Sequence, residues 1–174
     1  MKDDELLRYS RQIMLPQMDV AGQEALLNAN VLIIGLGGLG CPAAMYLASS
    51  GVGHLTLADD DVVDLSNLQR QIAHITDTIG LSKVASAAQA IHKLNDNVAV
   101  TELNRRLEGK ALEEAVSSAD VILDCTDNFS TRFSINAQAV KQKVPLVSGA
   151  AIRLEGQVRV FDSRHEGNPC YQCL

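Results

Sequence analysis

With 174 residues, the chain is long enough for one well-buried domain and too short to suggest two. Its formal net charge of −6 argues against a nucleic-acid partner, because no stripe of Lys and Arg is available to neutralise phosphates. No apolar run approaches the length of a membrane span, and the amino terminus has no signal-peptide pattern, so we expect a cytoplasmic protein with no membrane partner.

Two helices are expected before the first strand. The first covers residues 4–15, where Leu6, Leu7 and Met14 share one apolar side of an amphipathic pattern. The second covers residues 20–29 and leads directly into a strand.

The first strand and the loop after it organise the chain. Four aliphatic residues at 31–34 predict a strand buried on both faces, as in a parallel sheet. Gly35, Gly37 and Gly40 then fit a G-x-G-x-x-G pattern. The first permits a tight turn, the second lets backbone amides approach a phosphate, and the third lets the next helix pack closely. The helix expected over residues 41–50 points its amino terminus at a bound anion.

An acidic residue completes the pattern. Asp59 ends the second predicted strand (54–58), where dinucleotide-binding folds place a ribose-binding carboxylate. Because strand, loop, helix, strand and acid occur in this order, nucleotide binding is favoured over a glycine-rich turn that binds nothing. The identity of the nucleotide is left open.

The rest of the chain continues to alternate helices and strands, without internal repeats or low-complexity segments. This alternation predicts an α/β fold of the Rossmann-like, doubly wound type, with a mainly parallel sheet and helices on both faces. Ligands of such sheets bind beyond the carboxyl ends of the strands, where the glycine loop, Asp59 and Asp127 are expected to meet. The remaining expected elements are helices over 82–94, 110–118 and 131–143 and strands over 98–103, 121–123, 146–148 and 157–161.

Polar residues of specific types crowd into residues 64–70, which suits a binding segment better than a connector. Arg70 and Lys83 follow the ribose acid along the chain, where a guanidinium fork and a mobile ammonium can meet phosphate oxygens. The ordinary interpretation of Asn67 is a turn residue. Asp127 has two interpretations, a cap at the start of the next helix or an oxygen ligand for Mg²⁺ that bridges to substrate phosphates. Together these residues favour a nucleoside triphosphate.

Five short motifs occur together and in order along essentially the whole chain. They are RYSRQ (8–12), GLGGLG (35–40), DLSNLQRQ (64–71), DCTDN (124–128) and CYQC (170–173). The ordered set closely resembles the ThiF/MoeB family of sulfur-carrier adenylyltransferases, which are relatives of the ubiquitin-activating enzymes. The resemblance implies ATP-dependent adenylation of the C-terminal glycine of a ubiquitin-like sulfur-carrier protein, forming an acyl-adenylate and pyrophosphate for thiamine or molybdopterin cofactor biosynthesis.

The resemblance also implies roles for individual residues. It places Asp59 on the ribose, Asp127 on Mg²⁺ and Arg11 in the partner subunit's active site, since members of the family are homodimers. The implied nucleotide-binding residues are Gly38, Asp59, Ser66, Asn67, Leu68, Gln69, Arg70, Lys83, Asp127 and Asn128, and the implied catalytic residues are Arg11, Arg70, Lys83 and Asp127.

The adenylation of a carboxylate does not require the catalytic residue sets that this sequence lacks. A terminal carboxylate is ionised near neutral pH, so its adenylation needs no general base. The reaction needs alignment of the carboxylate on the α-phosphorus and neutralisation of charge as pyrophosphate leaves, which cations, Mg²⁺ and backbone amides supply. The absence of a Ser/His/Asp or Cys/His set is therefore expected. The four histidines are scattered, and we expect surface or packing roles for them.

Cys170 and Cys173 match half of the family's structural zinc site, whose second pair of ligands lies further along the chain, so Zn²⁺ is expected in the full-length protein. Cys41 and Cys125 are expected to be small buried hydrophobes. Residues 163–168 have almost no apolar side chain, while ordering each residue costs about 1–2 kcal/mol of backbone entropy. We therefore predict that the chain from about residue 163 onward is mobile or held only by a neighbouring chain, and that it carries no stoichiometric zinc.

One ATP-binding adenylation domain over residues 1–174 is expected, with amino-terminal helices at 4–29, a nucleotide-binding core at 30–161 and a Cys-x-x-Cys tail at 162–174. Two other functions remain open. An NAD-dependent oxidoreductase is favoured only by the glycine loop and Asp59, and a non-catalytic nucleotide-binding module is compatible with the short tail. Residues 59–61 and the helix near Asn136 favour the thiamine branch by resemblance.

Overall fold

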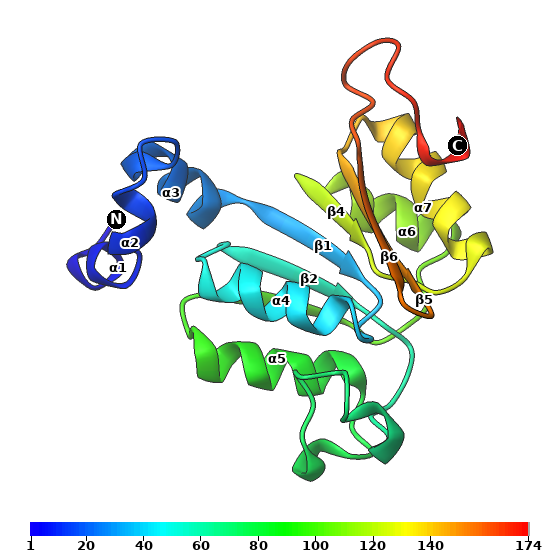
Figure 1. The fold of residues 1–174 in the computed structure, drawn as a ribbon, viewed down its shortest axis with the longest axis horizontal. Helices are drawn as coiled ribbons and strands as arrows, with labels where there is room; N and C mark the ends of the chain where they lie inside the picture. Colours follow the sequence, from blue (N-terminus) through cyan, green and yellow to red (C-terminus); the bar gives the residue numbers. More distant parts are fainter. Residues whose placement is uncertain (174) are drawn as a thin grey trace.

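The computed structural model describes residues 1–173, and its framework is one six-stranded sheet (Figure 1). The strand order is β3-β2-β1-β4-β5-β6; the first five strands pair in parallel, and β6 pairs antiparallel with β5. The strands are β1 (Asn30–Ile34), β2 (His54–Ala58), β3 (Ala99–Leu103), β4 (Val121–Asp124), β5 (Leu146–Ile152) and β6 (Glu155–Phe161). The predicted doubly wound α/β fold is confirmed.

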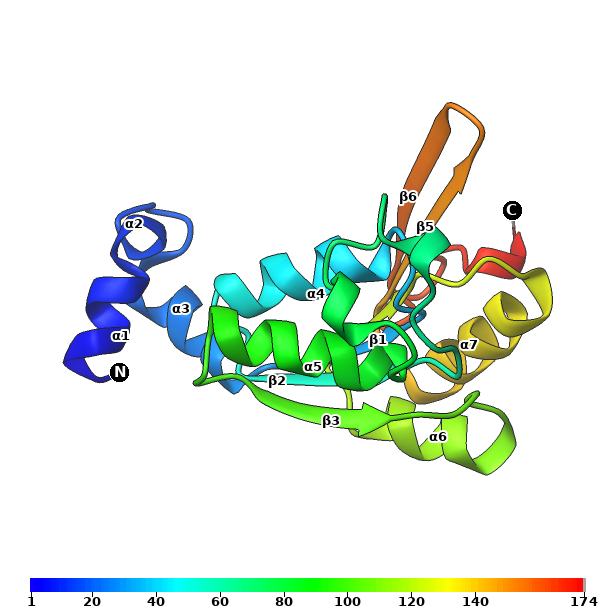
Figure 2. The same cartoon turned by 90° about the horizontal axis from the view of Figure 1, so that it is seen from below.

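Helices cover both faces of this sheet (Figure 2). They are α1 (Asp3–Arg8), α2 (Ser10–Ile13), α3 (Asp19–Asn28), α4 (Gly40–Ser49), α5 (Lys83–Leu94), α6 (Gly109–Ser117) and α7 (Phe129–Gln142), with short 3₁₀ turns η1 (Leu65–Asn67), η2 (Thr76–Thr78) and η3 (Tyr171–Cys173). Val31 and Ile33 of β1 pack with α4 and α5, whereas Leu32 and Ile34 pack with α6 and α7. Because neighbouring residues of a strand point to opposite faces, this sheet requires the unbroken apolar run of β1.

No helix within residues 1–173 combines the length and the apolar character that crossing a membrane demands. The amino-terminal helices lie at the start of β1, and the chain ends beside α7, at the other end of the molecule (Figure 1). The hairpin of β5 and β6 rises out of the body (Figure 2).

The single helix predicted over residues 4–15 is wrong, since α1 and α2 are separated at Tyr9. The ring of Tyr9 is 1 % exposed, and its hydroxyl accepts a hydrogen bond from Nδ2 of Asn95 at 2.9 Å. The aromatic ring thus takes the buried position that the amphipathic pattern gave to leucine and methionine. Leu7 and Met14, which were expected inside, are 79 % and 73 % exposed.

The last two strands are longer than expected. Antiparallel pairing runs without interruption from Leu146 opposite Phe161 to Ile152 opposite Glu155, so β5 extends four residues beyond the predicted end at 148. Backbone pairing across a hairpin depends on its partner strand, and the apolar pattern of β5 alone did not show where that pairing stops.

Candidate active site

A cleft of about 1160 Å³ lies along the carboxyl ends of the strands. Its walls come from the glycine loop, the ends of β2 and β4, the loop after β3 and the half of the β5–β6 hairpin next to its turn. Gly37, Gly38, Asp59 and Asp127 all line it. The predicted convergence of the glycine loop with these two carboxylates is therefore confirmed.

The glycine loop has the geometry that its spacing predicts. Gly35 has a φ of +91°, which L side chains rarely adopt. A Cβ atom at Gly40 would lie 1.8 Å from the carbonyl oxygen of Gly35, so this position requires close approach of helix and strand. Gly37 and Gly38 face the cleft, and α4 begins at Gly40.

Asp59 fixes the backbone at the base of the cleft. One carboxylate oxygen accepts a hydrogen bond from the amide of Leu36 at 2.6 Å, and the other accepts one from the amide of Asp61 at 2.9 Å. Nζ of Lys83 lies 2.7 Å from Oδ2 of Asp61. Lys83 is 6 % exposed and Asp61 is open to solvent, so the cation is held at the cleft by a single exposed carboxylate.

The segment after β2 forms a compact turn beside the glycine loop. Oδ1 of Asp64 accepts from the amide of Ser66 at 2.8 Å, and Oδ1 of Asn67 accepts from the amide of Asp64 at 3.3 Å. Nη1 of Arg70 donates to the carbonyl of Ser66 at 3.1 Å. Asn67 and Arg70 line the cleft. The other residues that the resemblance assigned to the nucleotide in this segment lie outside the cleft lining: Ser66, Leu68 and Gln69.

The residues after β4 distinguish the two interpretations of Asp127, a helix cap or a ligand of Mg²⁺. Oδ1 of Asn128 accepts a hydrogen bond from the amide of Thr131 at 2.9 Å and caps α7. The interpretation of Asp127 as the helix cap is therefore wrong. Asp127 is exposed, lines the cleft and makes no hydrogen bond or ion pair within residues 1–173. Its carboxylate oxygens are free to meet a ligand.

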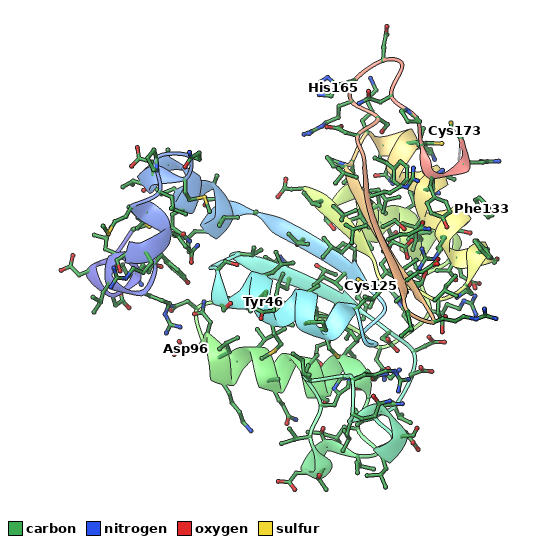
Figure 3. All side chains as sticks on the ribbon, viewed as in Figure 1. Tyr46, Asp96, Cys125, Phe133, His165 and Cys173 are labelled. Carbon is green, nitrogen blue, oxygen red and sulfur yellow. The ribbon has the colours of Figure 1, made fainter. Side chains whose placement is uncertain are left out.

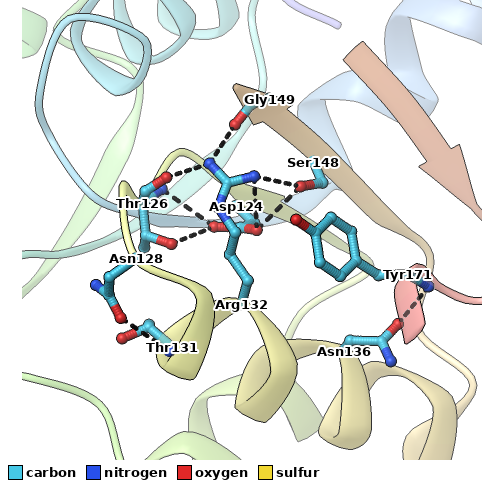
Figure 4. A network of polar contacts seen from close by, with 9 residues as sticks. All are labelled: Asp124, Thr126, Asn128, Thr131, Arg132, Asn136, Ser148, Gly149 and Tyr171. Atoms are coloured by element: carbon cyan, nitrogen blue, oxygen red, sulfur yellow. Dashed lines mark hydrogen bonds and ion pairs between the residues drawn. The ribbon is translucent and has the colours of Figure 1, made fainter. Parts of the chain in front are cut away.

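The opposite wall of the cleft contains a buried arginine that the sequence did not reveal (Figure 4). Arg132 and Asp124 are 6 % and 1 % exposed, and Nη1 of Arg132 lies 4.0 Å from Oδ2 of Asp124. The guanidinium also donates to Oγ of Ser148 at 3.2 Å, to the carbonyl of Gly149 at 2.7 Å and to the carbonyl of Thr126. The only available signal was Asp124 itself, an acid at the end of an otherwise apolar strand.

Three further cleft residues were missed. Gln71 is 3 % exposed, and its Oε1 has no hydrogen-bond partner within residues 1–173 although it lies beside the glycine loop. Arg105 and Arg106 follow β3 and add two cations to the lining. Gln71 could have been found as the last residue of the polar motif at 64–71.

A second cavity of about 350 Å³ adjoins the cleft. It lies between α7, the β5–β6 hairpin and η3, and its lining includes Phe133 and Arg159. The two cavities share lining residues, so the space beside the glycine loop continues toward the tail: Phe129, Arg132, Ala150, Gln157 and Tyr171.

The tail packs on its own chain, which corrects the prediction that it is mobile or held only by a neighbour. The ring of Tyr171 meets those of Phe133 and Phe161 edge-on, with centroids 5.8 Å apart in each pair. The amide of Tyr171 donates to Oδ1 of Asn136 at 2.9 Å. The prediction weighed the polar residues 163–168 and overlooked one aromatic ring that docks the segment behind them.

The cysteines form two separate groups. Sγ of Cys170 lies 3.6 Å from Sγ of Cys173, and a hydrogen bond from Asn136 lowers the pKa of Cys170. Burial raises the pKa of Cys41 to about 11 and that of Cys125 to about 12. Figure 3 labels Cys125 near the middle of the molecule and Cys173 in the tail. The prediction of a small buried residue is confirmed for Cys41, which is fully buried, whereas Cys125 is only partly buried and lines the cleft.

Arg11 does not lie in the cleft of its own chain. The amino-terminal helices pack at the other end of the sheet, where Nε2 of Gln12 donates to the carbonyl of Ser50 at 3.1 Å and Nη1 of Arg8 donates to the carbonyl of Leu94 at 3.2 Å. The carbonyls of Ser50 and Leu94 lie at the carboxyl ends of α4 and α5, and the amino ends of both helices lie at the cleft.

The model of the ThiF family matches residues 9–174. The chain belongs to the ThiF family. Over all 174 residues it is 53 % identical to the molybdopterin-synthase adenylyltransferase of Escherichia coli (strain K12) and 51 % identical to the sulfur carrier protein ThiS adenylyltransferase of the same organism, of which it spans 70 % and 69 %. The crystal structure of selenomethionine PaaA matches with a TM-score of 0.83 and 31 % identity, over 96 % of this chain and 53 % of that one.

These matches confirm the family and the enzyme class, an adenylyltransferase, that the ordered motifs predicted. The chain spans about 70 % of the bacterial ThiF-family relatives and about half of the PaaA chain. Identities of 53 % and 51 % are too close to separate the molybdopterin branch from the thiamine branch. The preference for thiamine from residues 59–61 and Asn136 stays a prediction.

Proposed function

We propose that this chain activates the C-terminal glycine carboxylate of a ubiquitin-like sulfur-carrier protein with ATP, in thiamine or molybdopterin cofactor biosynthesis. The observation that carries the proposal is one cleft that joins the glycine loop, the tethered cation of Lys83 and the free carboxylate of Asp127. Relatives named as adenylyltransferases over the whole chain support it. We further propose one adenylation domain over residues 1–174 that acts in the cytoplasm.

The cleft suits two reactants. Its volume of about 1160 Å³ exceeds the roughly 300–1,000 Å³ of most small-molecule sites, which leaves room for a peptide end beside a nucleotide. In the reaction a carboxylate oxygen of the carrier attacks the α-phosphorus of ATP, and the bond from that phosphorus to the leaving pyrophosphate breaks. The product is an acyl-adenylate. The protein's task is to align the two groups and to offset charge on the pyrophosphate.

We assign the phosphates to the backbone at Gly38 and to the side chains of Asn67, Arg70 and Lys83, and the ribose to Asp59. Each of these residues lines the cleft. A carboxylate oxygen has more than one acceptor position, so Asp59 can hold backbone amides and ribose hydroxyls together. Arg70 lies against the loop, since a Cβ at Gly38 would come within 3.6 Å of its side chain.

Asp127 is the residue that we assign to Mg²⁺, with Asn128 beside it. This carboxylate is exposed and has no hydrogen-bond or ion-pair partner within residues 1–173, which fits the oxygen ligand that Mg²⁺ would prefer. The metal, when bound, neutralises phosphate charge and helps to orient the leaving group. The cap of α7 is left intact because Asn128 provides it.

Cys170 and Cys173 are the residues that we assign to Zn²⁺ in the full-length protein. Two thiolates on a tetrahedral zinc with Zn–S bonds of about 2.3 Å stand roughly 3.8 Å apart, and the two sulfur atoms here are 3.6 Å apart. The pair supplies half of the ligands that such a site needs. Cys41 lies in the core and Cys125 packs against it, and burial raises the pKa of both thiols, so we do not assign them to this site.

We propose a homodimer in which Arg11 of each subunit reaches the active site of its partner. Two exposed apolar patches support this arrangement, one on the amino-terminal helices and one beside the cleft. The exposed members of the first are Leu6, Leu7, Met14 and Leu15, and those of the second are Val62, Leu65, Ile72, Ile75 and Ile79. Burying each against the other copy would bring the amino-terminal helices to the cleft and remove both patches from water.

Subunit complementation tests the dimer. Arg11→Ala and Asp127→Ala are each expected to be inactive, and their mixture is expected to recover activity because a hybrid dimer holds one site with both residues. A mixture of two Asp127→Ala preparations is the control and stays inactive. Absence of recovery despite demonstrated subunit exchange would place Arg11 outside the partner's site.

Carrier-dependent exchange of labelled pyrophosphate into ATP tests the reaction itself. Wild-type protein is expected to exchange label only with a carrier that ends in glycine and not with one that lacks its last residue. Asp127→Asn is expected to lower exchange about 10²–10³-fold. Glu102→Gln, which removes an exposed charge on β3 outside the cleft lining and outside both apolar patches, is the matched control and keeps wild-type exchange. Exchange without a carrier, or an active Asp127→Asn variant, would overturn the proposal.

Calorimetry separates the two other functions. We expect ATP with Mg²⁺ to bind more tightly than NAD, and Asp59→Ala to weaken ATP binding about ten- to a hundredfold, since a hydrogen bond to a charged group is worth roughly 1.5–3 kcal/mol. Equal affinity for NAD and ATP would favour the oxidoreductase. Tight ATP binding without carrier-dependent exchange would favour the non-catalytic module.

A further inference from the structure

A buried histidine lies between the glycine loop and α5. His74 is 3 % exposed and stands in the segment that leads from the cleft to η2. Its Nε2 is 3.3 Å from the carbonyl oxygen of Leu36, and its Nδ1 is 2.9 Å from Oγ of Ser86. The imidazole therefore contacts two elements that each carry part of the cleft, although it does not line the cleft itself.

The first contact fixes the glycine loop from the inside. The carbonyl of Leu36 can only accept, so the pairing places a proton on Nε2 of His74. Sγ of Cys41 donates to the same oxygen at 3.1 Å, and the amide of Leu36 donates to Asp59. Leu36 is thereby held on both sides of its backbone.

That anchoring sets the direction of the next amide. In a trans peptide the carbonyl of one residue and the amide hydrogen of the next point to opposite sides. With the Leu36 carbonyl turned inward to His74, the amide of Gly37 is turned outward, and Gly37 lines the cleft. No backbone or side-chain acceptor within residues 1–173 takes that amide.

The second contact reaches the helix that carries the cation. Ser86 lies on α5 one turn after Lys83, and Nζ of Lys83 stands 2.7 Å from Asp61 at the cleft. Oγ of Ser86 is also 2.8 Å from Oγ1 of Thr78, which ties the imidazole to η2. His74 thus bridges the loop that presents backbone amides and the helix that presents an ammonium group.

We propose that His74 is a positioning residue for phosphate binding: through the carbonyl of Leu36 it aims the amide of Gly37 at the phosphates of ATP. This inference rests on the proposed function only in that phosphates occupy the glycine loop. It assigns no proton transfer to the imidazole, which does not contact the cleft.

Two substitutions at His74 separate the two contacts. The amide nitrogen of Gln stands the same number of bonds from Cα as Nε2, so His74→Gln keeps a donor for Leu36. The side-chain amide of Asn is one bond shorter and matches the position of Nδ1. His74→Asn therefore keeps a hydrogen-bond partner for Ser86 and loses the donor to the carbonyl of Leu36. We expect His74→Gln to bind ATP within about twofold of wild type and His74→Asn to bind it roughly three- to tenfold more weakly.

The ratio of ATP affinity to adenosine affinity distinguishes a positioning role from a merely structural one, because a structural defect would weaken the binding of both ligands. Calorimetry and competition experiments on the whole chain give the affinity of adenosine beside that of ATP. Because adenosine has no phosphates, we expect His74→Asn to leave its affinity unchanged, so that only the ratio of ATP to adenosine affinity falls. Equal loss of both ligands, or equal behaviour of the two variants, would overturn the proposal.

A third variant covers the case in which His74→Asn does not fold. Cys41→Ala removes the other donor to the Leu36 carbonyl and is expected to lower the same affinity ratio by a smaller factor; an unchanged ratio in every folded variant would overturn the proposal. Wild-type protein that binds ATP but shows no carrier-dependent exchange would overturn the proposed function and leave the His74 comparison readable. Wild-type protein that does not bind ATP would overturn both.

Discussion

The two walls of the cleft hold their charges in opposite ways. In the glycine-loop wall, which comprises residues 35–83, Lys83 pairs with a carboxylate that is open to solvent. In the Arg132 wall, which we define as the cluster of Asp124, Thr126, Arg132, Ser148 and Gly149, both Arg132 and Asp124 are buried, and four oxygen atoms surround the guanidinium. Charge in the first wall remains available to a ligand, whereas charge in the second is committed to holding strands and helix together.

The two ion pairs contribute differently to the free energy of unfolding. Lys83 is itself buried, but its partner Asp61 is solvated, so the ammonium group can exchange this carboxylate for a phosphate at little cost. A buried pair contributes specificity of structure, and removing one member leaves an uncompensated charge in a medium of low dielectric constant. We therefore expect substitutions in the Arg132 wall to affect folding and those in the glycine-loop wall to affect chemistry.

The largest effect is expected from Arg132→Met. The substitution leaves the carboxylate of Asp124 buried without its cation, which costs about 3–5 kcal/mol of the free energy of unfolding. Urea denaturation measures it. Lys141→Met is the matched control on the same helix, because its ion pair with Glu113 is exposed, and it should cost less than about 1 kcal/mol. Equal stabilities of the two variants would contradict the contrast between the walls.

Lys83→Met should show the reverse pattern. Its free energy of unfolding is expected to stay within about 1 kcal/mol of wild type, because Asp61 remains solvated and Met fills the same space. Carrier-dependent exchange should fall about 10²–10³-fold as the phosphates lose a preorganised cation. Lys110→Met, outside the cleft lining, serves as the control for the charge change. A Lys83→Met variant with wild-type exchange and a clearly lower free energy of unfolding would contradict the contrast between the two walls.

Tyr171→Ala sharpens the comparison at the tail, where Tyr171 lines the second cavity together with Arg132. It removes two edge-on aromatic pairs, each worth about 0.5–1.5 kcal/mol beyond their buried area. Hydrogen exchange at the amide of residue 171, which is protected by Asn136, should quicken. Tyr171→Phe keeps both ring contacts and should preserve protection. Fast exchange already in wild type would restore the original expectation of a mobile tail.

The smallest effect is expected from pH. Burial lowers the pKa of His74 below its ordinary value of 6.5, and the groups that face it are Cys41, Asp59 and Lys83. The unfolded chain then binds more protons than the folded one just below that pH, so this residue's contribution to stability is present above about pH 6.5 and is lost as the pH falls. Urea midpoints from pH 7.5 to 5.5 should decline more for wild type than for His74→Gln. Parallel declines would contradict the prediction.

Several features were readable from the sequence because they depend on neighbours a few residues apart. The glycine loop belongs here, since the conformation of Gly35 and the crowding at Gly40 follow from local backbone geometry. The buried strand β1 was predicted for the same reason. Alternation of strands and helices then fixed the end of the sheet where a ligand binds, and with it the place of Asp59 and Asp127.

Other features required the tertiary structure because their partners are distant along the chain. Tyr9 displaced the expected leucines because its hydroxyl meets Asn95, 86 residues away. Arg132 lies in the helix predicted over residues 131–143, and only its approach to Ser148 and Asp124 in the folded chain buries it. A local pattern fixes backbone conformation and the periodicity of burial. Which polar groups lose their water is decided by long-range packing, and that packing decided which charges of this protein serve its fold and which remain free for a substrate.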